Sequence, residues 1–392
     1  MEAMSLPFGG DPEQFADAPL FRELQRVMAS SSGPVNWELA RQIGIASAQE
    51  GRDDPAPSEA DRHGFEEAVR VAELHVARFT GLEPPGDVAE VKPVRRAEWV
   101  NANTESLKTL LEPAAQKITA AMGEASRASM GELPPEMQAM SGVFEQLSPL
   151  LLGAQVGTVL GFLGQRVLGQ YDIAVPRPGP GALLFVVPNI ARFEQDWSLG
   201  ATDFRTYIAL HEVTHRFEFA RAWARDRFAE LLDDFLSTLK IDVGSMQDRL
   251  ATLDASDPDA LRSIMESEEG LFGTVLDDEQ RIKLGRIQAF MAAAEGYGDH
   301  VMHGVGATLL PSYPRIAEAM VRYREGEPGD PVFERLLGIE MKREQYTQGR
   351  AFCDTVVELT DEATLATMWD SAEAMPSLPE IEEPRLWLAR SA

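Results

Sequence analysis

Cysteine is almost absent from this sequence, in which Cys353 is the only one among 392 residues. An internal disulfide is therefore impossible, which excludes the small secreted scaffolds that depend on such bonds. We interpret Cys353 as a small packing residue, because the adjacent Asp354 disfavours the thiolate that a nucleophile would need. The first residues also lack the basic leader and apolar core of a secretory signal, so we expect a cytoplasmic protein.

Positive charge is scarce as well. Lysine and arginine number 36 against 63 aspartates and glutamates, which gives a formal net charge of -27. A chain this acidic repels phosphate backbones and anionic lipid surfaces, so we expect neither nucleic acid nor a membrane as a partner. The charge does not identify a substrate, and the sequence leaves the oligomeric state undetermined.

Long apolar runs are limited to one, Leu150 to Leu168, whose length approaches that of a membrane span. Its polar residues Gln155, Gln165 and Arg166 argue against that reading. Small residues recur every four positions at Gly153, Gly157 and Gly161, which allows another backbone to approach one helix face closely. We therefore predict a buried core helix here.

Segments with helical periodicity dominate the chain, and the best strand is Ala182 to Asn189. We predict a mainly α protein with a small β-sheet, an α+β fold. The edge of that strand is a candidate for holding an extended peptide. The expected organisation is a mobile N-terminal arm (1–30), a helical subdomain (31–140) and a catalytic unit with a helical C-terminal part (141–392).

A sharp chemical signal lies at His211-Glu212-Val213-Thr214-His215, which reads H-E-x-x-H. The stretch from Phe204 to Phe219 contains no proline or glycine, so the motif falls in a segment that can be helical. Two histidines four apart then lie on one helix face and can hold a single zinc ion. Glu212 would lie beside the metal, where a carboxylate can take a proton from water and pass it to a leaving group.

The third zinc ligand must come from elsewhere, because a catalytic zinc takes three protein ligands. Glu295 is the preferred candidate, on a helical stretch in which two glycines indicate close packing. Asp299, one turn later, can accept a hydrogen bond from a histidine ring and fix its tautomer. The alternatives for the ligand are Glu218, His300 and His303; Tyr297, His300 and His303 are also candidates for stabilising an oxyanion.

These residues resemble the gluzincin arrangement of zincin metallopeptidases, in which H-E-x-x-H precedes E-x-x-x-D on a second helix. The corresponding residues are His211, Glu212, His215, Glu295 and Asp299. Over most of its length the chain is similar to an uncharacterised bacterial zincin-like family whose members are classed as hydrolases, some in association with deazaflavin cofactor biosynthesis. The resemblance implies a zincin-like fold and a zinc site, and it supplies no substrate.

From the motif and the resemblance we expect a zinc-dependent hydrolase, most simply a metallopeptidase acting on a peptide or small amide. Glu212 would be the general base, with Tyr297 or His303 near the oxyanion. The alternative is a zincin-like scaffold that no longer catalyses and serves as a binding or structural protein.

Overall fold

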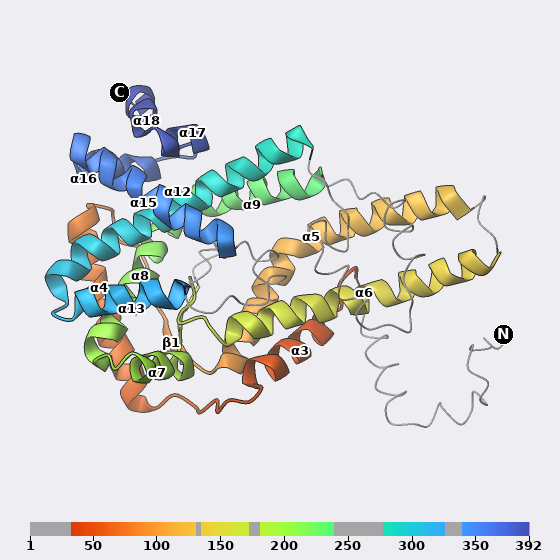
Figure 1. Ribbon diagram of the computed structural model, residues 1–392, viewed down its shortest axis with the longest axis horizontal. Helices are drawn as coiled ribbons and strands as arrows, with labels where there is room; N and C mark the ends of the chain where they lie inside the picture. The colour runs from red at the N-terminus through yellow and green to blue at the C-terminus, as the bar shows by residue number, and fades with distance from the viewer. Residues whose placement is uncertain (1–32, 131–134, 172–180, 239–276, 326–338, 392) are drawn as a thin grey trace.

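The structure is a computed structural model that describes residues 33–130, 135–171, 181–238, 277–325 and 339–391 (Figure 1). The N-terminal arm expected at residues 1–30 lies outside these ranges. The described chain is mainly helical with one small sheet, which confirms the predicted fold class.

The described elements follow one another along the chain in the order α3 (Trp37–Gln49), α4 (Glu59–Thr80), β1 (Val91–Val94), α5 (Arg96–Met130), α6 (Pro135–Gly164), β2 (Leu183–Val186), α7 (Val187–Asp196), α8 (Ala201–Phe219), α9 (Ala222–Ser237), α12 (Asp278–Leu309), α13 (Tyr313–Glu325), α15 (Ile339–Leu359), α16 (Glu362–Ala366), the 3-10 helix η1 (Thr367–Trp369), α17 (Leu378–Glu382) and α18 (Pro384–Ser391).

The sheet consists of the parallel strands β1 and β2, and it separates two hydrophobic cores. Successive side chains of a strand point to opposite faces. Leu183 and Phe185 accordingly belong to the large core of α4, α8 and α12, whereas Leu184 and Val186 belong to a smaller core with α5 and α6. Every residue of β2 is buried, as expected for a parallel strand covered on both faces.

The strand expected to run from Ala182 to Asn189 is shorter in the structure. It ends at Val186, and α7 begins at Val187 with Pro188 in its first turn, where a missing N–H costs the helix nothing. The predicted free edge was also wrong. Beside β1 on one side, β2 meets Gly169 in an antiparallel bridge at Phe185, and Val186 N donates to Leu168 O at 2.9 Å.

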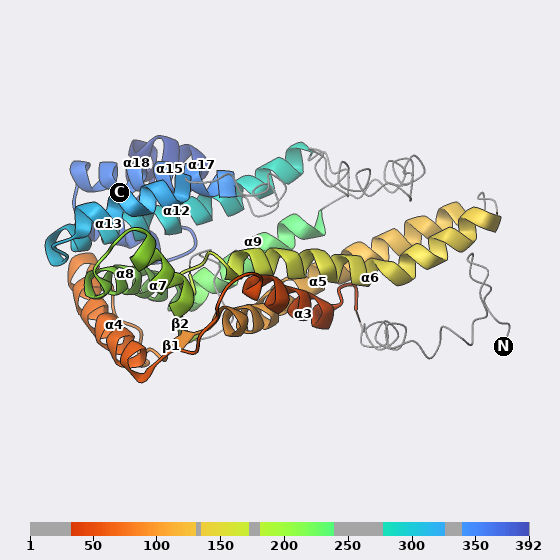
Figure 2. The same ribbon diagram turned by 60° about the horizontal axis from the view of Figure 1, so that its bottom comes forward.

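Helix α6 ends at Gly164, before the predicted Leu168, and the predicted close approach along its small-residue face is that of α3, while residues such as Thr158 are exposed. A side chain at Gly157 would lie 2.6 Å from the carbonyl oxygen of Ala40, and one at Gly161 would overlap Ser47. The helices α5 and α6 extend well beyond the rest of the described chain (Figure 2). Within the described ranges, no helix is both long and apolar enough to cross a membrane.

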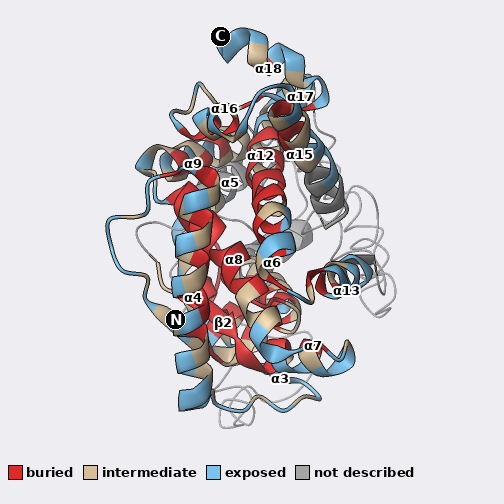
Figure 3. Ribbon diagram, turned by 90° about the vertical axis from the view of Figure 1, so that its left-hand side faces the viewer, coloured by how far each residue is buried: buried red, intermediate tan, exposed pale blue. Residues whose placement is uncertain are grey.

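The large core lies where α4, α8 and α12 pack together; α8 and the middle of α12 are buried, whereas α4 also has an exposed face (Figure 3). Helix α4 begins at a capping box, in which Ser58 and Asp61 satisfy each other's backbone N–H groups. It ends at Gly81, whose left-handed φ of 67° is accessible to glycine without strain. Arg205 of α8 joins Asp61 of α4 at 3.0 Å, so an element of the expected N-terminal subdomain contacts the H-E-x-x-H helix directly. The expected division at residue 140, which falls inside α6, stays a prediction.

Candidate metal centre

Helix α8 carries the H-E-x-x-H motif through the middle of the large core. Residues 207 to 219 are all buried, so the helix is surrounded by protein on every side. The rings of His211 and His215 lie one turn apart with centroids separated by 4.6 Å, in an edge-to-face arrangement. The predicted helix and the shared face of the two histidines are therefore present.

Glu212 is held by a segment that precedes it by about forty residues. Its Oε2 accepts hydrogen bonds from the backbone N–H groups of Gln170, at 2.8 Å, and Tyr171, at 2.9 Å. A side chain at Gly169 would overlap the Glu212 carboxylate, so only glycine fits at this approach. Because Gly169 also bridges to Phe185, the sheet fixes the segment that orients Glu212.

His215 is confined by four neighbours. Its Nδ1 lies 2.7 Å from Oε2 of Glu218, and its ring stacks on Phe219 with centroids 5.9 Å apart. The Tyr171 ring lies on another side, with a centroid distance of 5.8 Å. Across from α8, a side chain at Gly298 would come within 3.2 Å of Cε1 and 3.4 Å of Nε2. The edge of the imidazole that carries Nε2 therefore faces α12.

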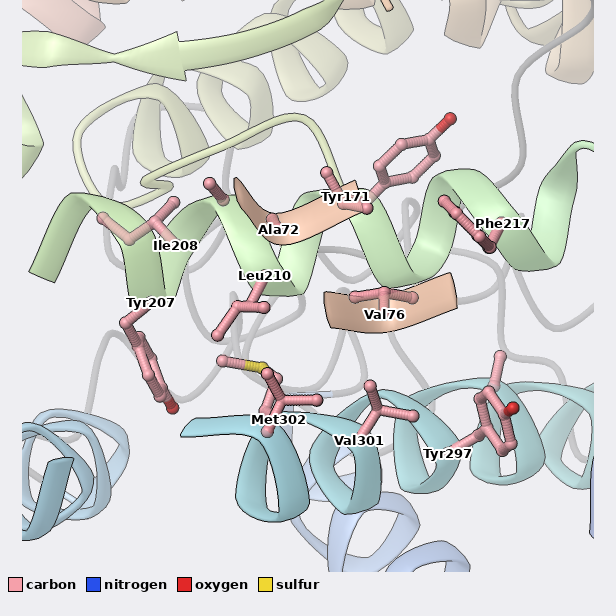
Figure 4. Close-up of a cluster of buried hydrophobic side chains, with 14 of the residues drawn as sticks. Ala72, Val76, Tyr171, Tyr207, Ile208, Leu210, Phe217, Tyr297, Val301 and Met302 are labelled. Carbon is pink, nitrogen blue, oxygen red and sulfur yellow. The ribbon is translucent and has the colours of Figure 1, made fainter. Parts of the chain in front are cut away.

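Helix α12 runs antiparallel to α8, so that Tyr207 lies near Met302 and Phe217 near Tyr297 (Figure 4). This direction brings Glu295, which is fully buried, into the same region as the motif. Burial raises the pKa of Glu218 well above its usual range, and the charge of Glu295 raises it further. Two carboxylates from different helices therefore repel each other in a dry interior beside two histidines.

The donor chemistry fits a zinc ion. Two imidazoles one turn apart and a buried carboxylate on a second helix are the donor types found in many catalytic zinc sites. A divalent cation would also offset the repulsion between Glu218 and Glu295. In the part of the chain that the structure describes, however, no three His, Cys, Asp or Glu side chains gather closely enough to hold a metal ion as they stand.

Asp299, predicted to accept a hydrogen bond from a histidine ring, lies one turn after Glu295 on α12, and that role stays a prediction. Its Oδ2 lies 3.0 Å from Nη1 of Arg350 on α15. The carboxylate at the His215 ring is that of Glu218. Asp299 and Glu295 lie one turn apart on α12, and α15 brings the guanidinium of Arg350 to the Asp299 carboxylate.

His300 and His303, the histidines that the sequence offered as alternative ligands, also lie on α12. His300 has Nδ1 at 2.7 Å from Asp354 and Nε2 at 3.0 Å from Glu362, so both its ring nitrogens face carboxylates. His303 is exposed, and its Nδ1 lies 3.0 Å from the hydroxyl of Tyr313. These polar contacts of the two rings are with residues of α13, α15 and α16.

Tyr297 is buried, and its ring meets Trp369 edge to face with centroids 5.7 Å apart. Burial and then the charge of Glu218 raise the pKa of Tyr297 well above its usual range, although the hydroxyl of Thr80 acts in the opposite direction. The phenol therefore keeps its proton and is a donor or acceptor, not a base. Cys353 is buried too, as expected, and burial raises the pKa of its thiol.

Sequence reasoning missed the backbone donors of Gln170 and Tyr171 and the role of Gly298 beside His215. A backbone N–H has no residue type that would identify it, and nothing local to positions 169–171 indicates a carboxylate. The two glycines around Tyr297 were a usable signal, because they indicated a close approach without showing what approaches.

A family model and a solved structure match this chain. The family model for zincin-like metallopeptidases matches residues 35–388. The chain belongs to this zincin-like family. This zincin-like chain is similar to a solved structure from Chloroflexus aurantiacus that is described as a candidate hydrolase with a novel fold. The TM-score is 0.65 and the sequence identity is 32%, and the match covers 91% of this chain and 98% of that one. No functionally curated protein matches the sequence.

Proposed function

We propose that this zincin-like protein is a zinc-dependent hydrolase of the metallopeptidase type. The observation that carries the proposal is that H-E-x-x-H lies on a central buried helix, and the buried Glu295 on the antiparallel α12 supports it. Membership of the zincin-like metallopeptidase family supports the same class of activity.

His211, His215 and Glu295 are the residues that would hold the metal. Zinc, when bound, supplies a Lewis acid that polarises a carbonyl and makes water more acidic. The edge of His215 that carries Nε2 is turned to α12, the helix of Glu295, which suits a site shared by the two helices. The absence of a side chain at Gly298 leaves the space that this approach needs.

Glu212 is the proposed general base. The two backbone donors on Oε2 hold its carboxylate in one orientation, so a proton is accepted and released at a fixed place. The proton that Glu212 takes from water would then pass to the leaving amine, so Glu212 would act first as a base and then as an acid. Tyr297 and His303 remain predictions as oxyanion stabilisers, and no step depends on them.

The substrate is proposed to be a peptide or a small amide that approaches from the side of His211. This residue retains 8% of its surface exposed, whereas Glu212, His215 and Glu295 are fully buried. A nearly closed site favours a substrate that inserts one bond or one chain end, and the net charge of -27 disfavours polyanions.

The test is hydrolysis of a library of peptides and small amides by zinc-loaded protein, with Glu212→Gln and Glu230→Gln measured in parallel. Removal of a general base lowers turnover by about 10² to 10⁴-fold, so Glu212→Gln should lose activity on that scale while still binding zinc. Glu230 is exposed on α9, so the same change there is the matched control and should leave turnover unchanged.

Two results would contradict the proposal. The first is that the wild-type protein binds no zinc. The second is that zinc binds, but that turnover is absent throughout the library or equal in wild type and Glu212→Gln. The second result would favour the alternative, a zincin-like scaffold that binds a partner without catalysis.

A further inference from the structure

Glu218 is in direct contact with the motif residue His215, and it is fully buried. It lies three residues after His215, almost one turn along α8, and its Oε2 is 2.7 Å from Nδ1 of His215. A buried ionisable side chain is costly unless it has a specific partner. The partner here is the imidazole of a proposed zinc ligand.

The two nitrogens of an imidazole lie on opposite sides of the ring. When Nδ1 carries the hydrogen and donates it to a carboxylate, the lone pair of Nε2 is available to a metal. A carboxylate at Nδ1 also orients the ring and increases the basicity of the other nitrogen. The ring of His215 has this layout, since Glu218 lies at Nδ1 and α12 lies at the edge with Nε2.

We propose that Glu218 is the positioning residue of the metal centre: it accepts the Nδ1 hydrogen of His215 and thereby presents Nε2 to zinc. This inference rests on the proposed zinc site and adds a role that the E-x-x-x-D pattern had given to Asp299. Asp299 is engaged with Arg350, whose Nε lies 3.3 Å from Asp354, so a chain of charges directs it toward α15.

The contact geometry also separates a positioning role from direct ligation. The Glu218 oxygen next to His215 is on the Nδ1 side of the ring, and a metal on the Nε2 side lies beyond the opposite edge. Phe219 stacks on the same ring and Tyr171 lies on another side of it, so the ring is confined in the orientation that Glu218 sets. Glu218 therefore acts on the metal through His215.

The first measurement is zinc affinity by competition with a chromophoric chelator. Loss of a residue that hydrogen-bonds a metal-ligating histidine typically costs about 10 to 100-fold in metal affinity, so Glu218→Ala should weaken zinc binding by that factor. Glu218→Gln keeps an oxygen acceptor of the same shape, so it should lose clearly less than Glu218→Ala. Asp299→Asn tests the other candidate carboxylate, and it should lose clearly less zinc affinity than Glu218→Ala.

The second measurement is the ring state of His215 by nitrogen-15 NMR of the zinc-loaded protein. In the wild type, His215 should show a protonated Nδ1 with slow hydrogen exchange. In Glu218→Ala this hydrogen should exchange faster, and Glu218→Gln should restore part of the protection. Circular dichroism of each variant establishes that the comparison is between folded proteins, and Glu218→Gln preserves the fold if Glu218→Ala does not.

Three outcomes would overturn the inference. One is unchanged zinc affinity in both Glu218 variants, and another is a loss in Asp299→Asn that matches the loss in Glu218→Ala. The third is equal and nearly complete loss in Glu218→Gln, Glu218→Ala and His215→Ala, which would make Glu218 a direct ligand. All three require that wild-type protein binds zinc, so they differ from failure of the proposed function, in which the wild type binds none.

Discussion

Two long helices of this protein carry closely spaced glycines, and they use them differently. On α6, a side chain at Gly153, Gly157 or Gly161 would meet α3 or the residue that precedes it. On α12, Gly296 faces the backbone of Gly349 on α15, whereas Gly298 faces the His215 ring. The glycines of α6 serve helix packing. On α12, Gly296 serves packing with α15, and Gly298 leaves room for the His215 ring.

The difference shows what a small-residue pattern means physically. Glycine lets another group come close to a helix axis, and the helix loses up to about 1 kcal/mol of propensity at each such position. The gain depends on what fills the space. Backbone fills it on α6 and at Gly296, and a backbone cannot move aside locally. At Gly298 the neighbour is a ring that was placed there by α8.

The largest expected effect is that of Gly296→Ala. The new methyl would overlap the Gly349 and Arg350 backbone, so α12 and α15 must separate. Overpacking of this kind costs about 3 kcal/mol or more, which should appear as a large drop in the midpoint of urea unfolding. A variant as stable as the wild type would show that the two helices are not in close contact.

Gly157→Ala should come next. Its methyl would lie 2.6 Å from the Ala40 carbonyl oxygen and 2.9 Å from Cβ of Ile43. We expect a loss of about 2 kcal/mol in the free energy of unfolding, with zinc affinity unchanged. Gly64→Ala is the control, because a methyl there meets only Nη1 of Arg205, at 3.8 Å. It should stabilise the protein by up to about 1 kcal/mol through helix propensity.

Gly298→Ala should separate the two uses of glycine. The methyl would lie 3.2 Å from Cε1 of His215, a tight contact that a small ring shift relieves. Stability should change little, because the gain in helix propensity offsets the contact. Zinc affinity should fall roughly tenfold, as for other changes that misorient a ligand. A fall in the free energy of unfolding as large as that expected for Gly157→Ala would instead make Gly298 a packing residue like Gly157.

The smallest effect concerns His300 of α12, which contacts Asp354 on α15. Burial lowers the pKa of His300, but hydrogen bonds to Glu362 and Asp354 outweigh it, so its pKa lies above the ordinary value. The folded state therefore holds this proton more tightly than the unfolded state. The resulting stabilisation is complete below the unfolded pKa of about 6.5 and is lost as the pH rises through the folded pKa.

His300→Gln should accordingly destabilise the protein by about 1 kcal/mol in mildly acidic buffer and by less in alkaline buffer. Thermal unfolding of wild type and variant across this pH range is the measurement. Asp354 and Glu362 are the carboxylates that face the ring, and Arg350 balances Asp354. A penalty that grows with pH would show that the imidazole is neutral in the folded protein.

Sequence alone determined much of the local structure. The absence of proline and glycine from Phe204 to Phe219 made α8 a helix, and 3.6 residues per turn then fixed His211 and His215 on one face. The spacing of Gly153, Gly157 and Gly161 determined that α6 would be packed closely. These features depend on residues a few positions apart, whose geometry one helix defines.

Tertiary structure decided what approaches the motif from other elements. Glu212 accepts from the backbone N–H groups of residues 170 and 171, and Asp299 contacts Arg350. The contact of His215 with Glu218, three residues apart, lies within α8 itself. Spacing gives angles around one helix axis, and it carries no information about the rotation of a second helix that begins some sixty residues later. That rotation follows from where Gly296 and Gly349 let α12 and α15 meet, which only the packed core determines.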